Sequence, residues 1–261
     1  MFLLDIEGIS AADVQTLHME NQARTNSLSA AQVSQFYREG YLVVPSLVSH
    51  DVVDKVLEEA RKVSLVEGGG WTPKIFDHLK PEQDPRLHHL LIEPAIVNVV
   101  EQLFEAQTRV YYGMLAIVPP KGGKGLPWHQ DNQYNQILGN ALNVFVALDD
   151  ITSEMAILWV APGSHKLGVQ PSKTNTTTAA GHREAVIEPE NGVQLPGLNK
   201  GDVCIFDRST YHRTLTNTTD MPRYAYAAQF MADYSRMAES GEKDPSKMLV
   251  SELKRIWDLR S

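Results

Sequence analysis

The chain changes character at Arg109-Val110-Tyr111-Tyr112-Gly113-Met114-Leu115-Ala116, a run rich in β-branched and aromatic residues. Such a run predicts a β-strand, because these side chains pack well on a pleated surface. Helical patterns precede it, and further short strand-like segments follow it between Gly, Pro and Asp turns. Helices first and many short strands afterwards predict a mainly β fold with flanking helices, either a sheet sandwich or a jelly-roll barrel.

Three helices and one strand are predicted upstream of this run. The first helix begins at Ser29, which has a glutamine three residues on in capping-box spacing, and it ends at Gly40. Tyr41-Leu42-Val43-Val44 then predicts a strand. Apolar residues at helical spacing predict a second helix from about Ser49, and a third is expected from Pro94 to Phe104.

The rest of the chain divides into strands, a polar excursion and a charged tail. The polar, Thr-rich stretch from Val169 to Asn191 predicts a surface excursion suited to form a lid, and the tail predicts a helix from Ser246 to Leu259. Four further strands are expected, at residues 141–148, 155–160, 203–206 and 223–230. We therefore expect an N-terminal arm (1–27) and one domain (28–261). That domain comprises a helical buttress (28–107), a jelly-roll core (108–232) and a C-terminal tail with a helix (233–261).

Composition limits the classes of partner and compartment. The 24 basic and 32 acidic side chains give a net charge of -8, which argues against nucleic acid or an anionic membrane as the main partner. Cys204 is the single cysteine and lies in a strand-like, apolar context, so we expect a core residue and a reducing compartment, the cytoplasm. No signal peptide is expected, and no apolar stretch approaches the length of a membrane span.

A candidate metal site lies at His129-Gln130-Asp131, with His212 far downstream. Residues i and i+2 of a β-strand point to the same face, so on a strand His129 and Asp131 would hold one ion together. Two imidazoles and one carboxylate form the facial triad of non-heme Fe(II) oxygenases, which leaves positions open for a cosubstrate and dioxygen. The simpler interpretation of His-x-Asp is a surface strand whose two side chains bind each other or water.

Nearby features favour the metal interpretation. The motif follows a Gly-rich loop, where binding residues are common, and His212 follows a predicted turn and strand. Arg223, on the next strand, supplies the fixed cation that a dicarboxylate cosubstrate requires. Arg208 and Arg213 could take the same role, but Arg213 directly follows a ligand and on a strand would point away from the iron.

The ordered set of motifs resembles the phytanoyl-CoA dioxygenase family of Fe(II)- and 2-oxoglutarate-dependent oxygenases. The resemblance covers about residues 28 to 232 and rests on Phe36 to Pro45, Leu126 to Asp131, Ala147 to Asp150, Pro162 to Lys166, His212 to Thr214, and Asn217 to Arg223. It implies a double-stranded β-helix, the jelly-roll or cupin-like barrel. It also implies three iron ligands: His129, Asp131 and His212. Four residues are implied for 2-oxoglutarate: Arg223 and Thr214 at its far carboxylate, and Tyr112 and Phe145 on the pocket strands.

One departure from the family pattern is visible. The family commonly has Asn-Gly-x-Leu before its Pro-Gly-Ser-His turn, whereas this chain has Ser153-Glu154-Met155-Ala156-Ile157-Leu158. The missing Gly affects the expected shape of that strand edge and not the iron site. His165, in the Pro-Gly-Ser-His turn, is expected to form structural hydrogen bonds.

The resemblance implies an enzyme that oxidises a C–H bond of a small molecule, most simply by hydroxylation, with dioxygen and decarboxylation of 2-oxoglutarate to succinate. Similar halogenases replace the carboxylate ligand with Gly or Ala, so Asp131 argues against halogenation. Desaturation, epimerisation and ring formation stay open, because they use the same ligands. Two functions of a different kind also stay open: a non-catalytic cupin-like metal-binding or sensor protein, and a cupin-like metalloenzyme that needs no 2-oxoglutarate.

The sequence carries less information on the substrate. Five residues are expected to face it: Met114, Trp128, Gln133, Tyr134 and Asn135. This mixture of apolar and amide groups suits a mid-sized, partly apolar metabolite as readily as an acyl thioester. The number of subunits is left open.

Overall fold

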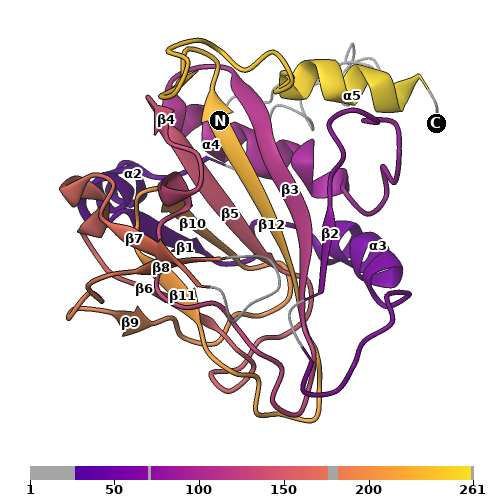
Figure 1. Cartoon of the computed structure of the whole chain (residues 1–261). Helices are drawn as coiled ribbons and strands as arrows, with labels where there is room; N and C mark the ends of the chain where they lie inside the picture. The colour runs from indigo at the N-terminus through magenta and orange to yellow at the C-terminus, as the bar shows by residue number, and fades with distance from the viewer. Residues whose placement is uncertain (1–26, 70–71, 176–181, 260–261) are drawn as a thin grey trace, which may run out of the picture.

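The computed structural model describes residues 27–69, 72–175 and 182–259, so the predicted arm lies outside the described residues apart from Ser27. A six-stranded sheet in the order β1-β10-β5-β12-β3-β2 forms its centre, and every pairing in it is antiparallel. Its strands are β1 (Tyr41–Val44), β2 (Thr72–Ile75), β3 (Thr108–Val118), β5 (Ala141–Ala147), β10 (Val203–Asp207) and β12 (Arg223–Ala232). A smaller antiparallel sheet packs against it (Figure 1). It contains β11 (His212–Thr214), β6 (Leu158–Val160) and β9 (Val193–Gln194).

The large sheet is buried on both faces because its strands alternate between two cores. On β5, Leu142, Val144 and Val146 pack against the helices. Phe145 and Ala147 point the other way, toward the apolar residues of the small sheet. The helices are α2 (Ala30–Glu39), α3 (His50–Ala60), α4 (Pro94–Phe104) and α5 (Val250–Asp258). The site therefore has a rigid floor, held from behind by the helical layer.

Most of the predicted elements are present. Ser29 caps α2 in a capping box, and Gly40 ends that helix with a φ of 78°. The predicted strand at residues 155–160 is shorter than expected: Leu158–Val160 forms β6, and Met155 makes an isolated bridge to Asn217. The C-terminal helix likewise begins at Val250 rather than Ser246. Cys204 is buried in β10, as predicted, and burial raises the pKa of its thiol.

The mainly β sandwich with flanking helices agrees with the predicted fold class. Within the described residues, no strand pairing joins the two sheets into a closed barrel. Shorter elements complete the described chain: the pair β4 (Ile137–Leu138) and β13 (Arg236–Met237), the pair β7 (Ser172–Thr174) and β8 (Arg183–Ala185), and 3-10 turns at His89–Leu91, Asp131–Gln133 and Ser164–Leu167. The predicted lid segment contains β7, β8 and most of the loop before β9, and its residues 176–181 lie outside the described residues.

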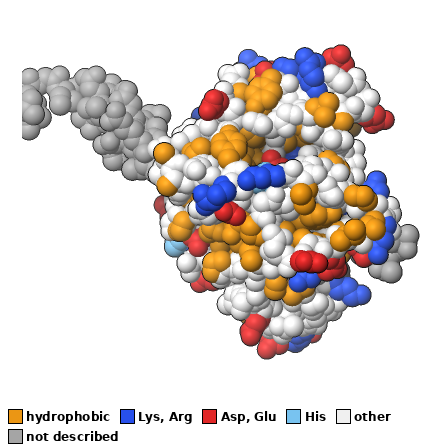
Figure 2. Space-filling view, turned by 90° about the vertical axis from the view of Figure 1, so that its left-hand side faces the viewer, with side chains coloured by type: hydrophobic (Ala, Val, Ile, Leu, Met, Phe, Trp, Pro, Cys, Tyr) orange, Lys and Arg blue, Asp and Glu red, His pale blue; other side chains and the backbone are white. Residues whose placement is uncertain are grey.

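The surface shows mixed charge. On the face drawn in Figure 2, basic and acidic side chains are interspersed with hydrophobic ones. Among the residues that the structure describes, no helix has both the length and the apolar character needed to cross a membrane.

Candidate active site

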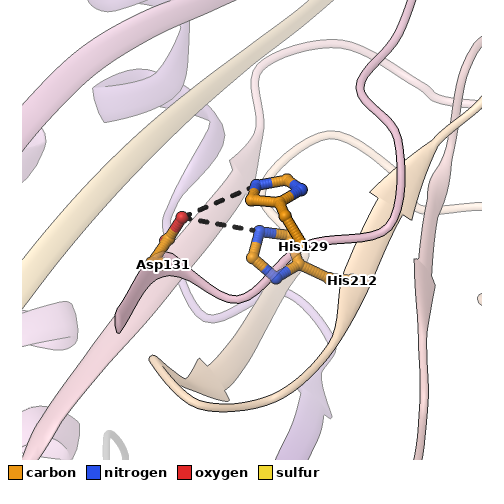
Figure 3. A group of neighbouring side chains, drawn as sticks. All are labelled: His129, Asp131 and His212. Atoms are coloured by element: carbon orange, nitrogen blue, oxygen red, sulfur yellow. Dashed lines mark ion pairs between the residues drawn. The ribbon is translucent and has the colours of Figure 1, made fainter. Parts of the chain in front are cut away.

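Three side chains meet between the two sheets: His129, Asp131 and His212 (Figure 3). The Oδ1 atom of Asp131 lies 3.6 Å from Nε2 of His129 and 3.8 Å from Nε2 of His212. An ion about 2.1 Å from each ligand spans separations up to about 4.2 Å, so these distances fit a single bound metal. All three residues are buried, with 3%, 9% and 7% of their surface exposed. The residues predicted from sequence as ligands therefore converge.

The local structure that brings them together differs from the prediction. His129 pairs with His212 in an isolated antiparallel bridge, with backbone N–H···O distances of 3.0 and 2.9 Å. The chain then leaves this pairing, and Asp131 begins a 3-10 turn instead of continuing a strand. The side chain of Gln130 is fully buried and donates to the carbonyls of Gly168 and Ser209, which explains why the chain bends there. The prediction of one strand carrying both ligands was wrong.

Hydrogen bonds orient both imidazoles toward the ion site. Nδ1 of His129 lies 2.7 Å from the carbonyl oxygen of Pro127, and Nδ1 of His212 lies 3.0 Å from that of Thr210. A carbonyl only accepts, so each Nδ1 carries the proton and each Nε2 keeps its lone pair for a metal. Burial, together with the nearby His212, also lowers the pKa of His129 to about 4, which keeps that ring neutral.

Asp131 is held by residues that the sequence analysis did not select. Its Oδ2 atom accepts hydrogen bonds from the amides of Asn143, at 2.5 Å, and Gln229, at 2.9 Å. Arg208 donates in turn to the Gln229 amide oxygen and to the backbone oxygen of Asp131. Burial acts to raise the pKa of Asp131, but His212, Arg208, His129 and the Asn143 hydrogen bond together lower it. These contacts fix the carboxylate as an anion with Oδ1 facing the histidines.

The triad opens into a cavity of about 380 Å³. Its floor follows the register of the large sheet. Gln229 pairs with both Tyr112 and Asn143, which makes one polar row, and Ala227 pairs with Met114 and Phe145, which makes an apolar row. Tyr112 and Phe145 thus line the cavity, where the sequence placed them. The floor is polar beside Asp131 and apolar farther along β12.

Arg223 lies at the far end of this floor and is 3% exposed. Its Nη1 donates to the carbonyl oxygen of Ala156 at 2.8 Å, whereas its Nε has no hydrogen-bond partner within the described chain. Burial lowers the pKa of Arg223 to about 10, and no described carboxylate pairs with it. A buried guanidinium with unused donors is costly unless an anion binds there. The Thr214 hydroxyl, also in the cavity wall, accepts from the Leu126 N–H at 3.0 Å and keeps its own proton to donate.

Comparison with known proteins now identifies the family. Residues 36–225 match the phytanoyl-CoA dioxygenase (PhyH) family. The chain belongs to this family. Its relatives include phytanoyl-CoA dioxygenase domain-containing protein 1 of Danio rerio, 28% identical over 162 residues, which are 59% of this chain and 55% of that protein. The match thus spans about half the length of the zebrafish protein. An ectoine dioxygenase of Bordetella parapertussis is 25% identical over 230 residues, 76% of this chain and 73% of that protein.

Solved structures agree with this assignment of the fold. The epimerase SnoN of nogalamycin biosynthesis, described as non-heme and alpha-ketoglutarate-dependent, superposes with a TM-score of 0.67 at 22% identity, over 84% of this chain and 97% of SnoN. The carbocyclase SnoK of the same biosynthesis also gives 0.67, at 20% identity, over 87% and 97% of the two chains. The predicted family and the predicted jelly-roll fold are both confirmed.

The family pattern clarifies the departure at residues 153–158. Ala156 occupies the position of the family's glycine and has a φ of 54°, in the left-handed region that favours glycine. Its carbonyl oxygen is the acceptor for Arg223. The backbone thus keeps the conformation that a glycine would adopt without strain. Ala156 is strained in this conformation, which directs its carbonyl oxygen to Arg223.

The remaining predicted residues divide into two groups. Met114, Tyr134 and Asn135 line the cavity, whereas Trp128 and Gln133 are not part of its lining. Trp128 precedes His129 in an extended segment, so its side chain points to the opposite side. The centroid of its indole ring lies 4.7 Å from the central carbon of the Arg213 guanidinium. Gln133 turns back within the 3-10 turn and donates to the carbonyl oxygen of Gln170. These two positions correct the predicted substrate pocket.

Arg208 and Arg213 also belong to the cavity wall, but the Arg213 guanidinium packs with residues outside the lining, which agrees with the expectation that it points away from the iron. Arg213 is held between two indoles, with its guanidinium 4.7 Å from the ring centroids of both Trp128 and Trp159. Arg208 directs its donors to protein oxygens around Asp131. Arg223 is therefore the arginine best suited to bind an anion.

His165 contacts the carbonyl oxygen of Tyr37 at 3.2 Å, which suits a structural role.

Proposed function

We propose that this chain is an Fe(II)- and 2-oxoglutarate-dependent dioxygenase that oxidises a C–H bond of a small-molecule metabolite, most simply by hydroxylation. 2-Oxoglutarate is converted to succinate and carbon dioxide in the same reaction. One observation carries the proposal: a buried His-Asp-His cluster faces the same cavity as a buried arginine with unused donors. The names of the relatives support it, since they include an ectoine dioxygenase and an L-proline trans-4-hydroxylase of Streptomyces griseoviridis.

Each part of the cavity has a role in this proposal. His129, Asp131 and His212 would hold the iron, which would supply the redox chemistry for oxidising an unactivated C–H bond with dioxygen. Arg223 and the Thr214 hydroxyl bind the far carboxylate of 2-oxoglutarate. The apolar row of Met114, Phe145 and Ala227 excludes water from the part of the cavity between this carboxylate site and the triad. The crystal structure of the similar protein SnoN in complex with Fe3+ and alpha ketoglutarate supports this cofactor set.

Different outcomes of the same chemistry are distinguished by the product. Desaturation, epimerisation and ring formation need the same three ligands, so the metal site does not select among them. Mass spectrometry of the product separates a gain of one oxygen atom, a loss of two hydrogen atoms and an unchanged mass. We expect the gain of oxygen.

The proposed reaction is tested by succinate formation. Purified protein is freed of metal, then supplied with Fe(II), 2-oxoglutarate and air, and succinate is measured by chromatography with each component omitted in turn. We expect succinate only with all three, formed slowly by uncoupled turnover and faster with a true substrate. Binding of Fe(II) and 2-oxoglutarate without turnover on any tested metabolite would instead support a sensor. Turnover of a substrate without 2-oxoglutarate would support a cupin-like enzyme of another kind.

We also propose that residues 28–261 act as one domain in the cytoplasm. Trp257 of α5 belongs to the same core as the helices and the large sheet. The single cysteine, Cys204, is buried and free, which suits a reducing compartment.

A further inference from the structure

The cavity has an excess of positive charge on a chain whose net charge is -8. Its described lining contains four cations, Arg208, Arg213, Arg223 and Lys247, but Asp131 as its single carboxylate. Asp131 is committed to the metal in the function proposed above. Glu188 and Asp244, which are not part of the lining, approach Arg213 and Lys247 only to 3.9 and 4.0 Å. A negatively charged ligand would complete the pairing of the cavity cations.

The three arginines are already accounted for. Arg223 is assigned to 2-oxoglutarate. Arg208 donates from Nε to Asn132 at 3.2 Å and from its other nitrogens to Gln229 and the backbone beside Asp131. Arg213 lies between Trp128 and Trp159, with Glu188 at 3.9 Å. Lys247 is the cation that the proposed reaction has not used.

Lys247 is positioned to present its ammonium group to the cavity. Its backbone carbonyl oxygen accepts from Nη1 of Arg109 at 2.6 Å, and Arg109 also pairs with Asp233 at 2.7 Å. The Nζ atom lies 4.9 Å from the ring centroid of Tyr111 and 4.0 Å from the Asp244 carboxylate, at the limit of an ion pair. The side chain is only 15% exposed, and burial is the largest influence lowering its pKa. A half-satisfied, largely buried ammonium thus faces the cavity.

Tyr111 shows where in the cavity Lys247 lies. The β3–β12 register passes from Tyr112 opposite Gln229 to Val110 opposite Phe230, so Tyr111 is the extra residue of a β-bulge. A bulge lets two successive side chains turn toward one side, and both Tyr111 and Tyr112 line the cavity. Gln229 is six residues from Arg223 on β12, a separation of about 20 Å between backbones. Lys247 and Arg223 are therefore at opposite ends, with Asp131 near the Lys247 end.

We propose that Lys247 binds a carboxylate of the substrate, so that the substrate of the proposed dioxygenase is a small organic acid. 2-Oxoglutarate occupies the Arg223 end, and the substrate acid binds at the Tyr111 end with its remaining part directed to the metal. The cavity volume of about 380 Å³ limits both ligands to small molecules. Lys247 lies beyond residues 36–225, the part of the chain that matches the family. This inference rests on the proposed function and names its substrate class.

The test compares acids with their neutral amides. The probes are cyclohexanecarboxylate, phenylacetate and N-acetyl-L-proline, each beside its carboxamide. They are titrated by calorimetry into the full chain loaded with Ni²⁺ and saturated with 2-oxoglutarate, which occupies the Arg223 end. We expect at least one acid to bind about tenfold or more tightly than its amide, because a hydrogen bond to a charged group contributes that much. Lys247→Met should remove this preference, and Lys247→Arg should keep it.

The controls separate this inference from the proposed function. Lys254→Met changes an exposed lysine of the same C-terminal segment and should leave the preference unchanged. Binding of 2-oxoglutarate, measured first, reports on the proposed function alone and should be equal in wild type and Lys247→Met. The inference is wrong if the wild type prefers no acid over its amide, or if the preference survives in Lys247→Met with an unchanged thermal midpoint.

Discussion

The two ends of the cavity are built in different ways. At the Arg223 end, regular strands place the side chains, and the register of β12 with β3 and β5 fixes the rows of the floor. At the Lys247 end, a β-bulge at Tyr111 and the segment before α5 supply the groups that face the ligand. The first end lies within the family match and the second extends beyond it. In the proposed function, the end that binds 2-oxoglutarate is thus built from strands within the family match, and the end that binds the substrate draws on residues beyond it.

The largest effect is expected at the proposed metal site, near the Lys247 end. Asp131→Ala removes the one anionic ligand and leaves His129 and His212 to hold the ion alone. We expect loss of bound iron and of all 2-oxoglutarate turnover, measured as iron content and succinate formation. Asp131→Asn, which keeps the volume, should also be inactive. Asp220→Ala, at an exposed carboxylate, should behave as wild type. Normal turnover in Asp131→Ala would show that the ion is held elsewhere.

The next effect isolates the Arg223 end. Arg223→Met removes the buried guanidinium but keeps much of its aliphatic packing. We expect the KM for 2-oxoglutarate to rise about 10- to 100-fold, as for a lost charged hydrogen bond, with a smaller change in kcat. Arg223→Lys should recover only part of the affinity, because one ammonium cannot reproduce the planar fork. An unchanged KM would direct attention to Arg213, the other cavity arginine with an unpaired nitrogen.

A smaller effect is expected behind the metal ligand. Asn143→Ala removes the 2.5 Å hydrogen bond to Oδ2 of Asp131 but leaves Gln229 in place. Residues that orient a ligand typically account for 10- to 100-fold in metal affinity, and we expect a loss of about tenfold in the affinity for Fe(II). High iron concentrations should restore turnover, which a general folding defect would not allow. Equal affinity in the variant would mean that Gln229 alone orients the carboxylate.

Much of the fold could be predicted because its strands carry local signals. β3 and β12 are rich in β-branched, aromatic and small apolar residues, and α2 has a complete capping box. β2 was missed because Thr72-Pro73-Lys74-Ile75 is short and its two central residues, Pro73 and Lys74, disfavour a strand. It lies at the edge of the sheet, where a proline is tolerated and pairing with β3 supplies the structure. Such a strand depends on its partner and not on its own residues.

The candidate site likewise combines residues that have a local sequence signal with residues that long-range contacts put in place. The three candidate metal ligands could be predicted from residue type and order, but the turn at Asp131 depends on the buried amide of Gln130, whose partners lie far along the chain. Asn143 and Gln229 had a readable signal, since each is a polar residue with an apolar residue on either side in its strand. Lys247 had no such signal in the sequence, because its approach to Tyr111 depends on a long-range contact of the C-terminal segment.

The smallest expected effect concerns backbone strain at Ala156, whose carbonyl oxygen accepts a hydrogen bond from Arg223. Ala156 has a φ of 54°, a conformation that costs a residue with a Cβ roughly 1–2 kcal/mol more than glycine. Ala156→Gly removes this cost but adds freedom to the unfolded chain, so we expect a net gain of about 0.5–1 kcal/mol in the free energy of unfolding. Denaturant titration measures it, and Ala147→Gly, in the regular strand β5, should destabilise by comparison. The KM for 2-oxoglutarate should not change, because the Ala156 carbonyl still accepts from Arg223. A loss of stability in Ala156→Gly would mean that contacts of the alanine methyl group outweigh the backbone strain.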